Sequence, residues 1–304
     1  MAKTLTAALK SKLIAPFFMA GSKQFSSGPV SALPPTEIIR PGYYFGREPF
    51  GPAHGVQVPN GPDGLPKFVN WLKVPGAVSQ CKNQLNCDAS YIIATLGSIS
   101  SLNYLTNKSS ILLSAQHILD GNTVTNHGCM HGWPENVFDF IIRNGGVVSE
   151  IDYPYCGTRG TCKAVEAEGV SIAKWAAVEA TEEAVKYAVA YQPVVSSIYT
   201  NSKFRRYSKG LLKVPRIHGP VNHCVLLVGY DESPREGGCW IGMSSYRRRW
   251  GMKLDNYRNM FLIPRNTTHV GGAVGVLTNV VLPLGASMVP KVKTRSESCP
   301  ACFK

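Results

Sequence analysis

The sequence has no uninterrupted run of about 18 apolar residues, the length that a membrane-spanning helix needs. The nearest candidate, 271–289, contains Asn279 and Pro283 and is rich in valine, so buried strands explain it better. Acidic residues are also scarce. The 304 residues include 19 Asp and Glu against 32 Lys and Arg, which gives a formal net charge of +13. This excess favours an acidic partner: an acidic protein surface, an anionic lipid surface or RNA. A basic surface that meets only solvent is the alternative.

The first 36 residues contain no Asp or Glu, although they hold four lysines. Leu5, Leu9 and Leu13 lie on one face of a helix, and an acid-poor amphipathic start of this kind predicts a mitochondrial presequence over residues 1–27. A secretory signal peptide with Leu13–Ala20 as its apolar core is the alternative, although that core is short and contains a proline. Residues 28–64 are rich in Pro and Gly, which predicts an extended arm.

The segment Lys82–Ser100, KNQLNCDASYIIATLGSIS, indicates a loop that runs into a helix. Asp88 is the expected N-cap and Ser90 the expected first residue, while Ile92 and Leu96 recur at helical spacing and predict a buried face. A side chain at such a helix start meets free backbone N–H groups and the positive end of the helix dipole. Both stabilise an anion, so this position suits a nucleophile.

The motif KNQ at Lys82–Gln84, followed by Cys87, resembles the papain-like cysteine proteases. Their catalytic cysteine corresponds to Ser90 in this chain. Further matching motifs are LSAQHILD at 113–120, GCMHG at 128–132, NHCVLLVGY at 222–230 and WG at 250–251. The resemblance implies a papain-like domain over 65–284 with an α+β, two-lobe fold. One lobe would be helical and contain the central helix, and the other would be an antiparallel, barrel-like β lobe.

The resemblance also implies the roles of the site residues. The catalytic histidine corresponds to His223, the asparagine that orients it corresponds to Ser244, and Gln84 could still donate to an oxyanion. An alcohol is a much weaker acid than a thiol, so Ser90 would need general-base help. Losing the orienting group in a serine triad costs about 10⁴-fold in rate. The sequence therefore predicts a catalytically inactive homologue, a pseudoprotease that is not an enzyme.

The chain has nine cysteines. The resemblance implies a disulfide between Cys87 and Cys129, and a second one between Cys162 and the position that Gly121 occupies here. Because Gly121 cannot form it, Cys156 is a local alternative partner for Cys162. The odd count and the lost partner suit a reducing compartment. We expect no metal and no cofactor, since the one CxxC, at the C-terminus, lacks further ligands.

Arg247, Arg248 and Arg249 are adjacent in a segment that is usually rich in glycine in the family. They predict either a site for an anion or partner, or a loop that only solvent contacts. Residues 285–304 are predicted to be a basic C-terminal tail.

The combined prediction is a structural, non-catalytic subunit of a mitochondrial multiprotein complex, such as the respiratory chain or the mitoribosome. Its partners would be the protein subunits of that complex, and no small-molecule substrate is expected. Two alternatives stay open. One is a secreted or lysosomal pseudoprotease of the cathepsin type, and the other is a weak Ser–His hydrolase that depends on Ser90 and His223.

Overall fold

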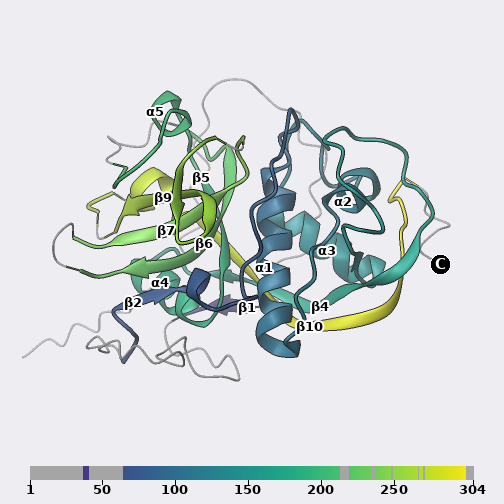
Figure 1. The fold of residues 1–304 in the computed structure, drawn as a ribbon, viewed down its shortest axis with the longest axis horizontal. Coiled ribbons are helices and arrows are strands. Elements are labelled where there is room, and N and C mark those ends of the chain that lie inside the picture. The colour runs from purple at the N-terminus through teal and green to yellow at the C-terminus, as the bar shows by residue number, and fades with distance from the viewer. Residues whose placement is uncertain are drawn as a thin grey trace, which may run out of the picture. The chain divides into compact units, whose positions relative to one another are not determined.

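The computed structural model describes residues 37–40, 64–212, 219–233, 237–247, 249–265, 267–269 and 271–298, which belong to one compact unit, Ala32–Lys304. Helices α1, α2 and α3 gather on one side of this unit, and strands β5, β6, β7 and β9 gather on the other (Figure 1). The predicted α+β fold with a helical lobe and a β lobe is therefore confirmed.

The helices of the described ranges have the following bounds: α1 Ser90–Asn107, α2 Ala115–Gly121, α3 Pro134–Asn144, α4 Glu182–Tyr191 and α5 Ser202–Arg205, with short 3₁₀ turns η1 Trp71–Lys73 and η3 Ala273–Gly275. Among these residues, no helix is long and apolar enough to cross a membrane.

The strands pair into one sheet in the order β1-β4-β10-β5-β6-β7-β9-β8, with β2 paired to β6 and β3 to β4. Their bounds are β1 Glu37–Ile39, β2 Phe68–Asn70, β3 Val147–Val148, β4 Glu166–Val178, β5 Val194–Ile198, β6 His223–Asp231, β7 Cys239–Ser244, β8 Met252–Leu254, β9 Tyr257–Pro264 and β10 Asn279–Lys293. Strand β10 joins the two lobes, because it pairs with β5 at Asn279–Val281 and then follows β4 as far as Lys293. It crosses behind the lower part of α1 in Figure 1.

Helix α1 lies between the lobes and is buried over most of its circumference. Ile92 and Ile99 pack into the core of the helical lobe, and the Ser98 hydroxyl donates to the carbonyl oxygen of Pro193, which precedes β5, at 2.8 Å. A helix that is apolar on nearly all sides is expected in such an interior position. The N-cap is Ala89 rather than Asp88, so the capping prediction is wrong: no side chain caps this helix.

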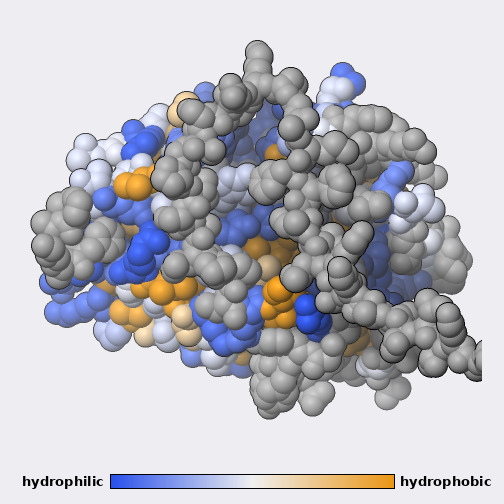
Figure 2. All heavy atoms as spheres, turned by 180° about the vertical axis from the view of Figure 1, so that it is seen from behind, coloured by the Kyte–Doolittle hydropathy of each residue, from blue (hydrophilic) through white to orange (hydrophobic). Residues whose placement is uncertain are grey.

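Two hydrophobic clusters support the fold. One fills the β lobe around Tyr230, Trp240 and Phe261, and the other fills the helical lobe around Phe138 and Phe140. Each of these five side chains is less than 2% exposed. On the opposite side from Figure 1, the described surface is largely hydrophilic, with a few groups of hydrophobic residues near the middle (Figure 2). In the part of the chain that the structure describes, most large apolar side chains are buried.

Two of the predicted domain divisions can be compared with these elements, and one cannot. The presequence predicted for residues 1–27 lies outside the described residues. Within the predicted arm, Glu37–Ile39 form strand β1, which runs parallel to β4. The predicted end of the domain at residue 284 falls inside β10, so residues up to 293 belong to the sheet rather than to a tail.

Residues 294–298 continue across the helical lobe instead of leaving it. The backbone N–H of Glu297 donates to the carbonyl oxygen of Gly121 at 2.9 Å, and the Glu297 carboxylate forms an ion pair with Arg143. A Cβ atom at Gly121 would lie 2.6 Å from the carbonyl oxygen of Arg295 and 2.7 Å from the Phe140 ring. The close approach of this segment thus explains why residue 121 is a glycine.

Candidate functional site

Ser90 is the first residue of α1 and lies where the helical lobe meets the start of β6. Its hydroxyl oxygen accepts a hydrogen bond from the backbone N–H of Cys224 at 3.2 Å. The side chain is buried, with 6% of its surface exposed. The hydroxyl is therefore fixed next to the residue that follows His223, at the positive end of a helix with 18 residues.

His223 is the first residue of β6, and two neighbours, Ser244 and Tyr246, hold its ring. Its Nε2 lies 2.9 Å from the Ser244 hydroxyl oxygen at the end of β7. The ring stacks on Tyr246, with a centroid distance of 4.3 Å and an interplanar angle of 11°. Burial, with a smaller contribution from the Arg205 guanidinium, lowers the pKa of His223 to about 3. The imidazole is therefore neutral at neutral pH, with one nitrogen able to accept a proton.

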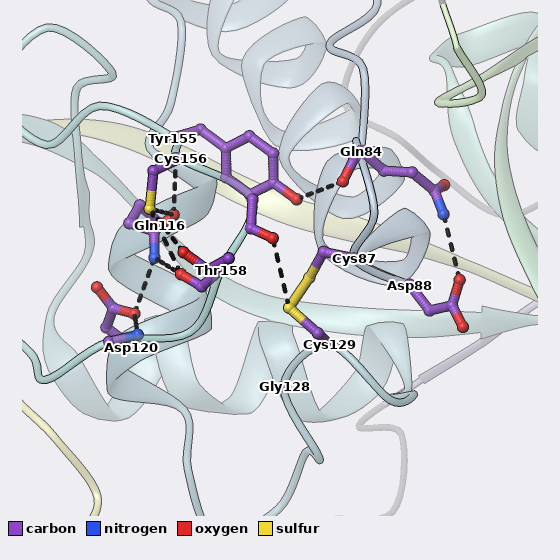
Figure 3. The surroundings of a disulfide bond; sticks show 12 residues. Gln84, Cys87, Asp88, Gln116, Asp120, Gly128, Cys129, Tyr155, Cys156 and Thr158 are labelled. Carbon is purple, nitrogen blue, oxygen red and sulfur yellow. Dashed lines mark hydrogen bonds between the residues drawn. A yellow bond between two sulfur atoms is a disulfide. The ribbon is translucent and has the colours of Figure 1, made fainter.

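Gln84 lies in the loop before α1 and contacts both lobes. Its side-chain oxygen accepts from the Ser245 hydroxyl at 2.6 Å, and its backbone N–H donates to the carbonyl oxygen of Ser245 at 2.9 Å. Its side-chain NH₂ points to the Asp88 carboxylate at 3.5 Å, while the Tyr155 hydroxyl donates to its backbone carbonyl at 2.9 Å (Figure 3). The amide is thus oriented, but it already has a weakly bound anionic partner.

A disulfide joins Cys87 to Cys129 across 42 residues, as the resemblance implied. Next to it, the backbone N–H of Asp88 donates to the carbonyl oxygen of Cys129 at 3.0 Å. The disulfide therefore ties the loop between Gln84 and Ser90 to the helical lobe (Figure 3). Cys156 and Cys162, the suggested local pair, are both free thiols in the structure.

Cys224 follows His223 directly, and its thiol is buried. The Cys224 sulfur lies 3.6 Å from the Ser197 hydroxyl, and burial raises the pKa of the thiol to about 12. With Cys81, it borders an apolar cavity of about 50 Å³ between α1 and the ends of β6 and β7. Burial raises the pKa of Cys81 to about 12 as well. Neither sulfur is ionised at neutral pH, and a thiol is a poor nucleophile in that state.

The predicted arginine segment follows β7. Arg247 and Arg249 are exposed, and Arg248 lies outside the described residues. The structure thus brings Gln84, Ser90, His223 and Ser244 into one site and places exposed cations next to it. In the described ranges, no cluster of three or more His, Cys, Asp or Glu side chains is arranged to hold a metal ion.

Sequence reasoning missed two contributors to the site. Ser245 holds the side chain of Gln84, and Asp88 competes for its amide. The position of Asp88 between Gln84 and Ser90 was a usable signal, because an acid that close in sequence had to lie close to the helix start. Nothing in the sequence indicated the contact of Ser245, since it depends on how the two lobes meet.

Comparison with known proteins places this geometry in context. A family model described as "Papain family cysteine protease" matches residues 65–276. The cysteine proteinase RD21A of Arabidopsis thaliana is 32% identical over 226 residues, which is 73% of this chain and 47% of the relative. Zingipain-1 of Zingiber officinale is 32% identical over 225 residues, which is 73% of this chain and 98% of the relative. The chain therefore spans about half of the first relative and nearly all of the second.

The solved structures agree. The bromelain protease of Ananas comosus, determined in complex with an inhibitor, superimposes with a TM-score of 0.66 at 28% identity, covering 73% of this chain and all of bromelain.

These findings correct the functional prediction. The matched relatives are named as cysteine proteases, so the prediction of a non-catalytic, non-enzymatic subunit of a mitochondrial complex is wrong. The prediction of a pseudoprotease is wrong for the same reason. That prediction rested on the serines expected at two catalytic positions and on the acid-poor N-terminus, whereas the family match and the named relatives indicate a cysteine-protease scaffold.

Proposed function

Because the chain belongs to the papain family of cysteine proteases, we propose that it is a hydrolase of peptide or ester bonds. In this proposal Ser90 occupies the position of the family's nucleophilic cysteine, and His223 is its base. The observation that carries the proposal is the location of the Ser90 hydroxyl at the start of α1, hydrogen-bonded to the residue that follows His223.

The first half of the reaction acylates Ser90. The hydroxyl oxygen attacks the carbonyl carbon, and His223 accepts its proton at Nδ1, in the tautomer whose Nε2–H donates to the Ser244 hydroxyl. The tetrahedral oxyanion is stabilised by the N–H groups at the helix start and by the Gln84 amide. The intermediate then expels the amine or alcohol, which takes the proton from His223.

The second half releases the acid. A water molecule attacks the ester that Ser90 forms with the acyl group, His223 accepts a proton from this water, and the Ser90 oxygen takes that proton as it leaves. The products are a carboxylic acid and the free enzyme, so no further reactant is required.

Two features of the site make this hydrolysis slow. The hydroxyl of Ser244 replaces the amide that the family uses to orient its histidine, and losing an orienting group costs about 10⁴-fold in rate in a serine triad. The Asp88 carboxylate also holds the Gln84 amide, so an oxyanion must displace it. We therefore expect activated esters to be cleaved more readily than peptides.

The disulfide supports an oxidising compartment, such as the secretory pathway or the lysosome. Cytosolic thiols are normally kept reduced, whereas Cys87 and Cys129 are paired in a loop that orients the site. The secretory interpretation of the N-terminal segment is consistent with this proposal, and the mitochondrial interpretation is not.

The test measures hydrolysis of a p-nitrophenyl ester and of a fluorogenic peptide by the wild-type chain and three variants. Ser90→Ala and His223→Ala should each lower the rate to that of the uncatalysed reaction. Ser208→Ala, which alters an exposed serine outside the site, should leave the rate unchanged. Hydrolysis that persists in folded Ser90→Ala would contradict the proposal.

A further inference from the structure

Four exposed arginines, Arg205, Arg206, Arg247 and Arg249, form what we call the arginine patch. Two of them are at the end of α5, and two are in the loop that follows β7. Of the three arginines predicted from the sequence, only Arg247 and Arg249 belong to the described residues. The pair on α5 was not predicted, because 40 residues or more separate the two segments in the sequence.

An aromatic cluster brings the two segments together next to His223. The indole N–H of Trp250 donates to the carbonyl oxygen of Phe204 at 3.0 Å, and the Phe204 ring contacts the rings of Trp250 and Tyr246. Tyr246 in turn stacks on His223. Since Arg205 follows Phe204 and Arg247 follows Tyr246, the backbone fixes these two arginines at the rim of the site.

The charge of the patch is not compensated locally. Residues 199–212 and 243–254 contain no Asp or Glu. Among the described residues, none of the four guanidiniums forms an ion pair with a carboxylate, although Arg265 in the same lobe binds both Glu182 and Glu232. Several unpaired guanidiniums on adjoining segments attract anions and bind carboxylates in a bidentate manner.

We propose that the arginine patch receives an acidic polypeptide segment, so that substrates carry Asp or Glu residues on the β-lobe side of the cleaved bond. This inference rests on the proposed function only in assigning the polypeptide as substrate, since binding itself does not need Ser90. Asp88 lies with Gln84 on the loop that leads into α1 and would repel acidic residues there. The preference for acids is therefore confined to the β-lobe side.

A polypeptide fits the patch better than RNA does. Single-stranded nucleic acids are held by exposed aromatic rings on which bases stack, in addition to cations. Here most aromatic residues of the two segments are used internally: Phe204 is 0% exposed, Trp250 is 6% exposed, and the half-buried Tyr246 stacks on His223. The patch thus offers charge with little aromatic surface for stacking, which suits the flexible carboxylates of Asp and Glu.

The test uses the full chain with Ser90→Ala, so that binding is measured without turnover. Fluorescence anisotropy follows titration of a fluorescein-labelled hexaglutamate peptide at low and at high salt, with hexaglutamine as the uncharged comparison. Hexaglutamate should bind more tightly than hexaglutamine at low salt, and the difference should shrink as salt screens the charges. Equal binding of the two peptides would overturn the proposal, and this comparison needs no patch variant.

Patch variants then locate the site. Arg205→Ala and Arg247→Ala should each weaken hexaglutamate binding about fivefold, the effect of one unit-charge contact at about 4 Å in water. The matched control is Lys108→Asn. The substitution removes one cation at the far end of α1. Asparagine tolerates the left-handed backbone conformation at this position (φ 56°). It should change binding less than twofold. An effect of Lys108→Asn as large as that of the patch variants would refute a local site.

The remaining outcomes are also decisive. Tighter binding of a hexauridylate RNA than of hexaglutamate would replace the acidic polypeptide with a nucleic acid. Binding of hexaglutamate without any Ser90-dependent hydrolysis would retain the patch and refute the proposed function. Ser90-dependent hydrolysis together with equal binding of hexaglutamate and hexaglutamine would retain the proposed function and refute the patch.

Discussion

Breaking the disulfide between Cys87 and Cys129 is expected to destabilise the protein substantially. The bond closes a loop with a sequence separation of 42 residues, for which loop-closure entropy gives a stabilisation of about 4 kcal/mol at 25 °C. For a domain of this size, a loss of 1 kcal/mol lowers Tm by about 2–4 °C, so the expected decrease in Tm is roughly 8–16 °C.

The assay is thermal unfolding followed by circular dichroism, with and without reductant. The double variant Cys87→Ala/Cys129→Ala should unfold at the temperature of the reduced wild type and should no longer respond to reductant. Cys156→Ala, which removes an exposed free thiol, is the matched control and should unfold like the oxidised wild type. The reasoning is refuted if the wild type keeps its Tm after mass spectrometry shows both thiols to be reduced.

Three further predictions concern the same fold and site. Gly121→Ala should lower the free energy of unfolding by about 1–3 kcal/mol, because its Cβ would lie 2.6 Å from a backbone oxygen. Gly160→Ala, where the nearest atom lies 3.7 Å away, should cost less in the same urea titration. Burial lowers the pKa of His117 and of His223 to about 3, so the unfolded state binds more protons between about pH 6.5 and 3. Stability should therefore decrease as the pH is lowered through that window, by up to about 1.4 kcal/mol per histidine and pH unit, and His117→Leu should remove the contribution of one histidine from the slope. Asp88→Gly should raise ester hydrolysis about tenfold by freeing the glutamine amide for the oxyanion, and an unchanged rate would show that the carboxylate does not obstruct the site.

Much of the fold could be predicted because its determinants are local or carried by ordered motifs. The apolar spacing of Ile92 and Leu96 indicated α1, and the valine-rich segment after residue 271 was correctly interpreted as strand rather than membrane span. The extent of β10 could not be predicted, because its second half contains polar residues such as Ser287 and Lys291. Such a sequence is also typical of a tail, and only the pairing with β4 identifies it as a strand.

The candidate site was predicted only as far as its residues lie in recognisable motifs. Gln84 and His223 lie in such motifs, and the structure brings both side chains to the site. The contacts that set their chemistry come from elsewhere: Ser245 orients the amide, and Arg205 contributes to the low pKa of the imidazole. Such contacts join segments that are distant in the sequence and meet only in the folded protein, so no spacing in the sequence reveals them.

The capping prediction failed for a related reason. Aspartate is a preferred residue type at an N-cap. The Asp88 carboxylate is directed to the Gln84 amide instead, and α1 begins without a side-chain cap. The free N–H groups at the helix start therefore stay available for an anion, which is what a nucleophile position requires.

The central claim is that Ser90 is a nucleophile, and the most direct measurement is its labelling by a fluorophosphonate. The folded wild-type chain would be incubated with the probe and digested, and the modified residue would be located by tandem mass spectrometry. The account predicts one adduct, on Ser90, which is absent from His223→Ala because the base is lost. An adduct on another residue, or none on Ser90 in the folded protein, would contradict it.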